Sequence, residues 1–227
     1  MAKRGRPAGF DRAEALQRAM ELFWGRGYEG ATLDDLQAAM GGISPPSFYH
    51  AFGSKEALFR EVAGLYIASV CAPPVRAMEN ARTAREGIDA MLRRAVENFT
   101  QPGKPQGCLL HTATKCAPAN QGPQGYLQTA RRHAPEAIAG RLKRAVAEGD
   151  VSPDADLRRI VVFYVTIAHG LAFRAGDGAT RAELMTAVDG AMAAWTELAK
   201  PQPASRRPSR QSPSRPARNN QPISAQR

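Results

Sequence analysis

The sequence predicts an all-α fold with an N-terminal unit of three short helices and a larger helical region after it. In residues 11–66, capping residues repeatedly precede apolar residues spaced three or four apart, which is the pattern of amphipathic helices. The strongest competing signal is the run VVFYVTI within Leu157–Phe173, which in isolation suits a buried strand. Because the apolar run continues without a turn signal to Gly176, it exceeds ordinary strand length, and we interpret it as one buried helix.

The first helix is expected to begin after Asp11. Asp11 and Glu14 have the spacing of a capping box, in which two side chains satisfy free N–H groups of the first turn. One apolar stripe follows, made of Ala13, Leu16, Met20 and Phe23. This helix therefore has one face for a small shared core.

Residues 32–56, TLDDLQAAMGGISPPSFYHAFGSKE, predict two short helices joined by a glycine turn. Thr32 and Asp35 form a capping box for a helix whose apolar positions are Leu33, Leu36 and Met40. Gly41 and Gly42 end it. Ser44 then caps a helix with Pro45 at its first position, where the missing N–H costs nothing, and Ser54 caps the helix after that. Two helices around such a turn are typical of a helix-turn-helix reader of DNA.

The chemistry of this unit indicates how it would meet DNA. Helix starts at Thr32 and Ser54 present N–H groups to phosphate, and Lys55 adds a positive charge at the second of them. Ser47 and His50 could reach base edges, whereas Phe48 and Phe52 are expected to pack inward.

The motifs GRP, FDRAEAL, LFWGRGYEGATLDDL and PPSFYHAFGSKEALF resemble the N-terminal domain of the TetR/AcrR family of bacterial transcriptional regulators. The resemblance covers roughly residues 5–66. It implies that residues 44–52 form the recognition helix, and that Thr32, Tyr49 and Lys55 stand where family members usually touch phosphate. The expected DNA contacts are Arg4, Arg6, Thr32, Ser44, Pro45, Ser47, Tyr49, His50 and Lys55.

Residues 1–10 form a basic arm. Its Arg4-Gly5-Arg6-Pro7 segment resembles the core of an AT-hook, which places arginines in a narrow A·T minor groove. The alternative is a terminus that is merely basic.

Composition limits the other functions. The chain has 227 residues, 43% of them hydrophobic, and no apolar run approaches the roughly 18 residues of a membrane span. We therefore expect no membrane partner. The N-terminus has no secretory segment, and three cysteines are too few and too odd in number for a disulfide framework, so a reducing cytoplasm is expected, with nucleoid association when DNA is bound.

The net charge of +10 is concentrated at the two ends. A tail at residues 200–227 is rich in Arg, Pro and Ser, and from residue 201 onward it contains no acid. The arginines of residues 201–227 and the basic residues of the arm together account for +9 of this net charge of +10. Such a tail cannot bury a core and is expected to be disordered. It is either a passive extension or a second, sequence-independent contact to DNA.

Residues 67–199 predict a second helical domain. Ile88, Leu92, Val96 and Phe99 form one helical stripe, TQPGKPQG interrupts the chain, and a short helix should begin near Cys108. A longer helical stretch from about Pro123 should be interrupted or kinked by Pro135. Thr180 and Glu183 form a capping box for the last helix, whose apolar residues are Leu184, Val188, Ala191, Trp195 and Leu198.

The resemblance implies that this second domain binds a ligand and makes a homodimer. In the family, the two C-terminal helices of each subunit form a four-helix interface, for which the candidates here are Ile160, Ile167, Leu171, Leu184, Val188 and Trp195. The candidates for an inducer pocket are Tyr66, Phe99, Cys108, His111, Tyr126, Phe163, Tyr164, His169 and Phe173. Each aromatic among them has the alternative role of ordinary core packing.

A cluster around Cys108 suggests a sensor. On a helix, Cys108, His111 and Lys115 lie on one face, and a thiol in a first turn is favoured as thiolate, which would make a redox or electrophile switch. A soft-metal site with Cys116 is a weak alternative, since Cys116 lies about 80° round the helix from Cys108. The simpler alternative is a small buried hydrophobe.

Catalysis is not expected. Cys108 and His111 have no orienting carboxylate in the local sequence, and no glycine-rich phosphate loop or carboxylate pair is present, so we expect no catalytic residue, metal or cofactor. The sequence predicts a homodimeric repressor released from a palindromic operator in double-stranded DNA by a small-molecule or electrophile inducer. The alternative is a non-enzymatic helical adaptor that binds RNA or acidic partners through its tail.

Overall fold

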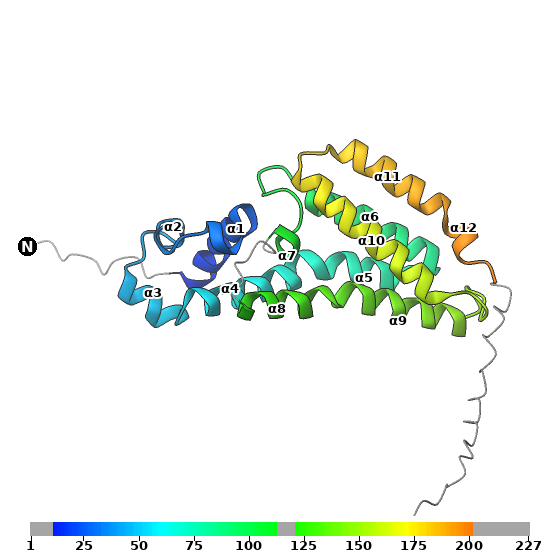
Figure 1. The fold of residues 1–227 in the computed structure, drawn as a ribbon, viewed down its shortest axis with the longest axis horizontal. Coiled ribbons are helices and arrows are strands. Elements are labelled where there is room, and N and C mark those ends of the chain that lie inside the picture. The colour runs from blue at the N-terminus through cyan, green and yellow to red at the C-terminus, as the bar shows by residue number, and fades with distance from the viewer. Residues whose placement is uncertain (1–10, 113–120, 202–227) are drawn as a thin grey trace, which may run out of the picture.

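The computed structural model describes residues 11–112 and 121–201, and within them every regular element is a helix. The all-α prediction is confirmed. The expected arm with Arg4 and Arg6, the tail after residue 201, Lys115 and Cys116 lie outside the described residues. Figure 1 shows an elongated molecule with the first helices at one end and the larger helical region at the other.

The N-terminal end contains four helices around one core. They are α1 (Arg12–Gly30), α2 (Leu33–Ala39), α3 (Pro45–Phe52) and α4 (Lys55–Tyr66). The aromatic rings hold them together: Phe23 packs edge-on against Phe59 of α4 at 5.1 Å between ring centroids, and Phe48 of α3 is fully buried in the same cluster. This core fixes how α3 sits on the domain.

Helix α1 begins as predicted but buries a different face. The Asp11 side chain accepts hydrogen bonds from the backbone N–H groups of Ala13 and Glu14. Ala13 is exposed and Leu16 only half-buried, so the predicted stripe is wrong at its start. The buried residues are Ala15, Ala19, Met20, Phe23, Trp24 and Tyr28. The two adjacent aromatics Phe23 and Trp24 are both buried, which turns the core-facing side away from Ala13.

The turn between α2 and α3 follows its residue types closely. The predicted capping box of Thr32 and Asp35 is present, with both of its hydrogen bonds made. Gly41 and Gly42 have φ values of 91° and 76°, which lie in the left-handed region that glycine adopts without strain. The Ser44 hydroxyl then accepts from the Ser47 N–H at 3.4 Å and caps α3 as predicted.

One long helical segment connects the two ends of the molecule. Helix α4 continues through a π-helical turn η1 (Ile67–Cys71) into α5 (Ala72–Asn80), so the backbone stays helical across the expected domain boundary after residue 66. By length and composition Lys55–Asn80 could cross a membrane. Core helices of soluble proteins meet the same criteria, and α4 is packed against α1, with Leu58, Phe59 and Val62 fully buried.

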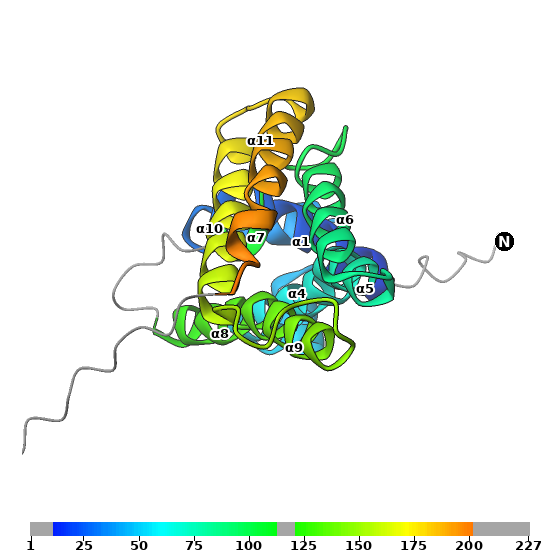
Figure 2. The same cartoon turned by 90° about the vertical axis from the view of Figure 1, so that its right-hand side faces the viewer.

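The larger region is a helical bundle, shown end-on in Figure 2. Its remaining helices are α6 (Ala84–Phe99), α7 (Leu109–Thr112), α8 (Gln121–Arg131), α9 (His133–Ala147), α10 (Leu157–Gly176), α11 (Arg181–Ala193) and α12 (Trp195–Leu198). The single helix predicted for the VVFYVTI run is confirmed as α10. The predicted interruption near Pro135 is the break between α8 and α9, and the short helix after Cys108 is α7.

Candidate DNA-binding surface and regulatory pocket

Helix α3 separates an inward aromatic side from an outward polar side. Phe48 and Phe52 are buried, which confirms their predicted orientation, and their rings lie 5.8 Å apart. The outward residues are Ser44, Pro45, Ser47, Tyr49 and His50, all exposed. Tyr49 has 51% of its surface exposed, so its ring is accessible from solvent. The exposed side of α3 can therefore enter a groove without any change in the core.

The candidate phosphate contacts lie at helix starts. The Thr32 hydroxyl donates to the Asp35 carboxylate at 2.7 Å, and Arg26 approaches the same carboxylate at 2.9 Å. The hydrogen bond from Thr32, followed by that from Arg26, lowers the pKa of Asp35, which keeps the cap ionised. Lys55 is half-buried at the start of α4, and its ammonium lies 4.5 Å from the centre of the Tyr28 ring. Both helix starts are thus held in place by their own side chains.

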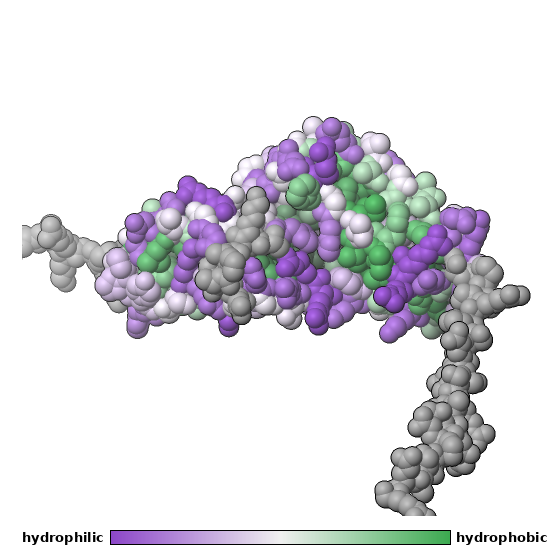
Figure 3. All heavy atoms as spheres, in the orientation of Figure 1, coloured by the Kyte–Doolittle hydropathy of each residue, from purple (hydrophilic) through white to green (hydrophobic). Residues whose placement is uncertain are grey.

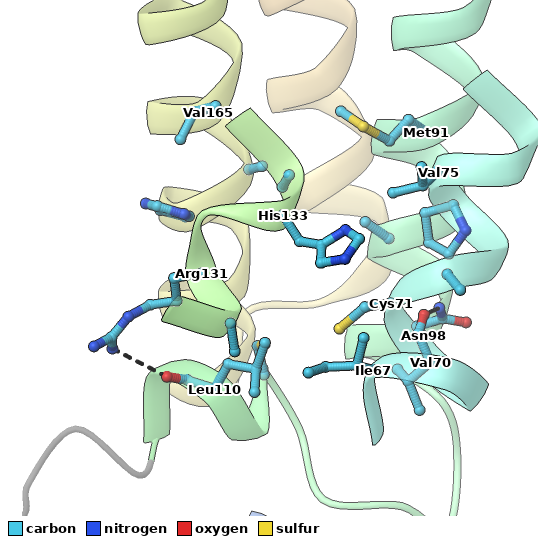
Figure 4. A pocket seen from close by; sticks show the side chains of 18 of the residues that line it. Ile67, Val70, Cys71, Val75, Met91, Asn98, Leu110, Arg131, His133 and Val165 are labelled. Atoms are coloured by element: carbon cyan, nitrogen blue, oxygen red, sulfur yellow. Dashed lines mark hydrogen bonds between the residues drawn. The ribbon is translucent and has the colours of Figure 1, made fainter. Parts of the chain in front are cut away.

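A cavity of about 300 Å³ opens in the larger region, which is the lower end of the range for small-molecule sites. Its walls come from α4, η1, α5, α6, α7, α8, α9 and α10, and Figure 4 shows Cys71 of η1 and Leu110 of α7 directed from different walls into the same space. The lining is mostly aliphatic, with a few polar groups such as Asn98. It suits a compact apolar ligand.

Five predicted pocket residues line this cavity: Tyr66, Phe99, Cys108, His111 and His169. The others lie elsewhere. Tyr126 packs against the N-terminal core, Phe163 packs edge-on against Tyr164, and the Tyr164 hydroxyl donates to the Ala191 carbonyl at 3.2 Å. Phe173 is 68% exposed. For these four residues the pocket prediction is wrong, because aromatics at helical spacing serve here as core or surface.

Several lining residues were missed by the sequence reasoning. Cys71 is one, and Asn98 is another, whose amide donates to the Val70 carbonyl at 2.8 Å. Arg131 donates to the Leu110 carbonyl at 3.1 Å (Figure 4). Their positions depend on the π-helical turn and on the α7–α8 contact, for which the sequence contains no periodic signal.

Two histidines form a polar corner of the pocket. The rings of His111 and His169 lie 4.5 Å apart. Burial, the nearby His169 and Arg131 lower the pKa of His111 to about 4, and burial with Arg131 also lowers the pKa of His169. Both imidazoles are therefore neutral at pH 7 and offer hydrogen-bonding atoms without charge.

Cys108 stands in the wall next to this corner. It is 6% exposed, and its carbonyl accepts from the Thr112 N–H at 2.9 Å. Hydrogen bonding from the Cys71 thiol, opposed by burial and helped by Tyr66 and backbone N–H groups of α7, lowers the pKa of Cys108 to about 7. The predicted face of Cys108 and His111 thus lines the pocket.

Comparison with known proteins agrees with this architecture. Residues 15–62 match the sequence family described as bacterial regulatory proteins, tetR family. The chain is 32% identical to the HTH-type transcriptional repressor ComR of Escherichia coli (strain K12) over 199 residues, which cover 87% of this chain and 94% of ComR. The chain belongs to the TetR family.

Two further relatives support this membership. The HTH-type transcriptional repressor BdcR of Escherichia coli (strain K12) is 31% identical over 106 residues, covering 47% of this chain and 53% of BdcR. A cysteine mutant of the TetR family regulator CifR, solved in complex with 26-bp double-strand operator DNA, has a TM-score of 0.80 and 40% identity, covering 84% of this chain and all of the CifR chain.

The TetR-family chain buries most of its candidate dimer residues within itself. Ile160, Leu171, Leu184, Val188 and Trp195 are at most 8% exposed in the single chain, and Ile167 is half-buried. Trp195 packs on Tyr164 of α10 at 5.9 Å between ring centroids. Five of these six side chains are thus not available to a partner without unpacking the subunit.

A different face of α10 is apolar and open. Val162 and Phe173 are 57% and 68% exposed, and Thr166 and Gly170 lie exposed between them. On α11, the exposed positions include the small residues Ala182, Thr186, Gly190 and Ala193. Figure 3 shows apolar surface over this side of the larger region. We call these eight residues the outer face of α10 and α11.

Proposed function

We propose that this TetR-family protein is a sequence-specific repressor that binds a palindromic operator as a homodimer and releases it when a small molecule fills the pocket. The observation that carries the proposal is the exposed polar side of α3 on a rigid aromatic core. The relative ComR is a transcriptional repressor, and CifR variants were solved with operator DNA. We expect the protein in the cytoplasm, associated with the nucleoid when it is bound.

Residues at the DNA surface have distinct roles in this proposal. Ser47 and His50, on the exposed side of α3, contact base edges. Tyr49, Lys55, Thr32 and the helix starts contact phosphate, with Arg4 and Arg6 of the arm in the adjacent minor groove. Ser44 and Pro45 set the angle at which α3 begins.

The dimer is proposed to form through the outer face of α10 and α11. An exposed apolar patch on a soluble domain marks an interaction site, and small residues allow two helices to approach closely. A second copy of the same face would cover Val162 and Phe173. Two α3 helices would then be presented to two half-sites of one operator.

The pocket is coupled to the DNA-binding helices by direct contacts. The Trp24 indole N–H of α1 donates to the Gly107 carbonyl at 3.2 Å, and the Trp24 ring packs edge-on against Tyr66 at 4.9 Å. A Cβ at Gly107 would lie 2.8 Å from the Ala172 carbonyl oxygen, so the backbone before α7 already packs closely against α10 and cannot move toward it. Ligand in the pocket therefore pushes on α1 and α4.

The test is selection of bound duplexes from a random pool, followed by titration of the selected duplex. A palindrome is expected, and Tyr49→Ala should weaken binding to every sequence by about tenfold, whereas His50→Ala should also change the base preference at one position per half-site. An equal reduction at all base positions for His50→Ala would remove His50 from base recognition. Recovery of no preferred duplex would refute the proposed function.

A further inference from the structure

Two cysteines from separate elements line the same pocket. Cys71 is the last residue of the π-helical turn η1, and Cys108 immediately precedes α7, yet both side chains line the same cavity and pack in the same core cluster. They are 37 positions apart in the chain. The described residues contain no group of three or more ligating side chains that could hold a metal ion, so the pair stands alone as a dithiol.

The surroundings make the two sulfurs unequal. The interaction between the two neighbouring thiols raises the pKa of Cys71 and lowers that of Cys108. The buried Tyr66 hydroxyl, which makes no hydrogen bond of ordinary length to any described residue, also faces the Cys108 sulfur. Cys108 is thus the nucleophile of the pair. Cys71 is the resolving thiol, which stays protonated until it attacks the oxidised Cys108.

We propose that Cys71 and Cys108 form an oxidation site for small organic hydroperoxides, whose product is an intrachain disulfide that weakens DNA binding. An uncharged organic hydroperoxide suits a cavity that is mostly aliphatic, because its alkyl group is buried there while its O–O bond reaches the sulfur. The effect on DNA binding rests on the proposed function, whereas the oxidation chemistry does not.

The reaction balances in two steps. The Cys108 thiolate attacks the terminal oxygen of the hydroperoxide, the O–O bond breaks, and the alkoxide takes a proton to leave as alcohol, which gives a sulfenic acid on Cys108. The Cys71 sulfur then attacks the Cys108 sulfur and loses its proton, the S–O bond breaks, and water leaves. Two thiols are oxidised by two electrons, and one hydroperoxide is reduced to alcohol and water.

The disulfide would act on the contacts that join the pocket to the DNA-binding helices. Closing the S–S bond to its length of about 2.05 Å requires η1 and the start of α7 to approach. The start of α7 is tied to α1 through the Trp24–Gly107 hydrogen bond, and η1 continues directly from α4. A π-helical turn can change its hydrogen bonding within a helix, and such turns recur at functional sites. Oxidation therefore shifts both helices that support α3.

The test uses the full chain with Cys116→Ser, so that two thiols remain, treated with tert-butyl hydroperoxide and then digested for mass spectrometry. The expected product is a Cys71–Cys108 disulfide that dithiothreitol reverses. Cys71→Ser should give a dimedone-trapped sulfenic acid on Cys108 and no disulfide, while Cys108→Ser should leave Cys71 unoxidised. Absence of the disulfide, or oxidation of Cys71 without Cys108, overturns the proposal.

The substrate class is tested by rate. We expect the ratio of the oxidation rates for tert-butyl hydroperoxide and hydrogen peroxide to be about fourfold or more higher in the folded chain than in urea, the gain from burying one methyl-sized group. An equal ratio in the two states would contradict a selective apolar site.

The last readout separates this inference from the proposed function. Oxidised protein should bind the selected operator about tenfold more weakly than reduced protein, within the usual range for coupling between sites. A disulfide that leaves affinity unchanged overturns the regulatory step. Reduced protein that selects no operator refutes the proposed function instead, and the mass measurement still decides the oxidation site.

Discussion

At the level of single residues, two neutral histidines at the polar corner of the pocket make the stability of the fold depend on pH. His111 and His169 lie 4.5 Å apart, and a proton on either ring would place a charge in a mostly apolar wall beside Arg131. The cavity therefore keeps two uncharged hydrogen-bonding groups at pH 7.

His111 predicts a pH dependence of folding. Its pKa falls from about 6.5 in the unfolded chain to about 4 in the folded one, so the unfolded state binds more protons between these values. Stability is thus fully present above about pH 6.5 and decreases as the pH falls toward 4, and the decrease attributable to His111 by pH 5 is about 2 kcal/mol. Urea unfolding at pH 7 and pH 5, at one protein concentration, measures it.

The control for this prediction is His111→Gln, which keeps a hydrogen-bonding side chain without a titrating proton. The variant should lose less stability than the parent between pH 7 and pH 5, with the remaining slope coming in part from His169, whose pKa is shifted in the same direction. Equal decreases in the two proteins would show that His111 is not the titrating group.

Arg141 is a second buried basic group, and it is held by hydrogen bonds to backbone carbonyls. The side chain of Arg141 on α9 is fully buried, and it donates to the carbonyls of Ala81 and Arg82 at 3.3 and 3.4 Å. Its second terminal nitrogen lies 3.6 Å from the Glu148 carboxylate. The guanidinium thus joins the residues after α5 to α9, although its Nε and Nη1 make no hydrogen bond within the described residues.

At the level of elements, the outer face of α10 and α11 predicts the assembly. Phe173→Glu would place a charge in the proposed interface, where a partner would have to desolvate it. We expect monomers by sedimentation at micromolar concentration and operator binding weaker by about 100-fold or more, because two half-site contacts would no longer be linked. Gln128→Glu, which adds the same charge at an exposed position of α8, is the matched control and should stay dimeric.

The elements that the sequence predicted are those whose signals are local. The capping boxes at Thr32 and Thr180 are present because each needs only residues three positions apart. The π-helical turn η1 was not predicted, since a shift in backbone hydrogen bonding leaves no hydrophobic period, and with it the inward position of Cys71 was missed.

The apolar stripe of α11 illustrates a different limit. Spacing shows that Leu184, Val188 and Trp195 face other apolar groups, but it does not say whether those groups belong to the same chain. In the structure they pack within the subunit, with Trp195 against Tyr164. Helix α3 was predicted more fully, because the buried Phe48 and Phe52 define its inner side and therefore which of its residues are exposed.

At the level of the whole molecule, the two thiols, the Trp24–Gly107 hydrogen bond and the long helical segment from α4 to α5 connect the pocket with the DNA-binding surface. Trp24 of α1 contacts Tyr66 at the end of α4, and α4 continues without interruption into the pocket wall. In the proposed mechanism, a change at the pocket reaches α3 through packed side chains and a continuous backbone.

The charge at the C-terminus gives the last prediction. Residues 202–227 contain six arginines and no acid, whereas the parts of the chain between arm and tail are nearly neutral. If these arginines touch phosphate, removing residues 202–227 should reduce the slope of log affinity against log salt by about 0.9 for each phosphate that the tail neutralises, because each such phosphate releases a counterion on binding. The preferred operator sequence should not change, since phosphate carries no base information.

Titrations of both proteins between low and moderate salt measure the two slopes. Identical slopes would make the tail a passive extension and assign the salt dependence to the arm and to Lys55, whereas an altered sequence preference would mean that the tail reads bases.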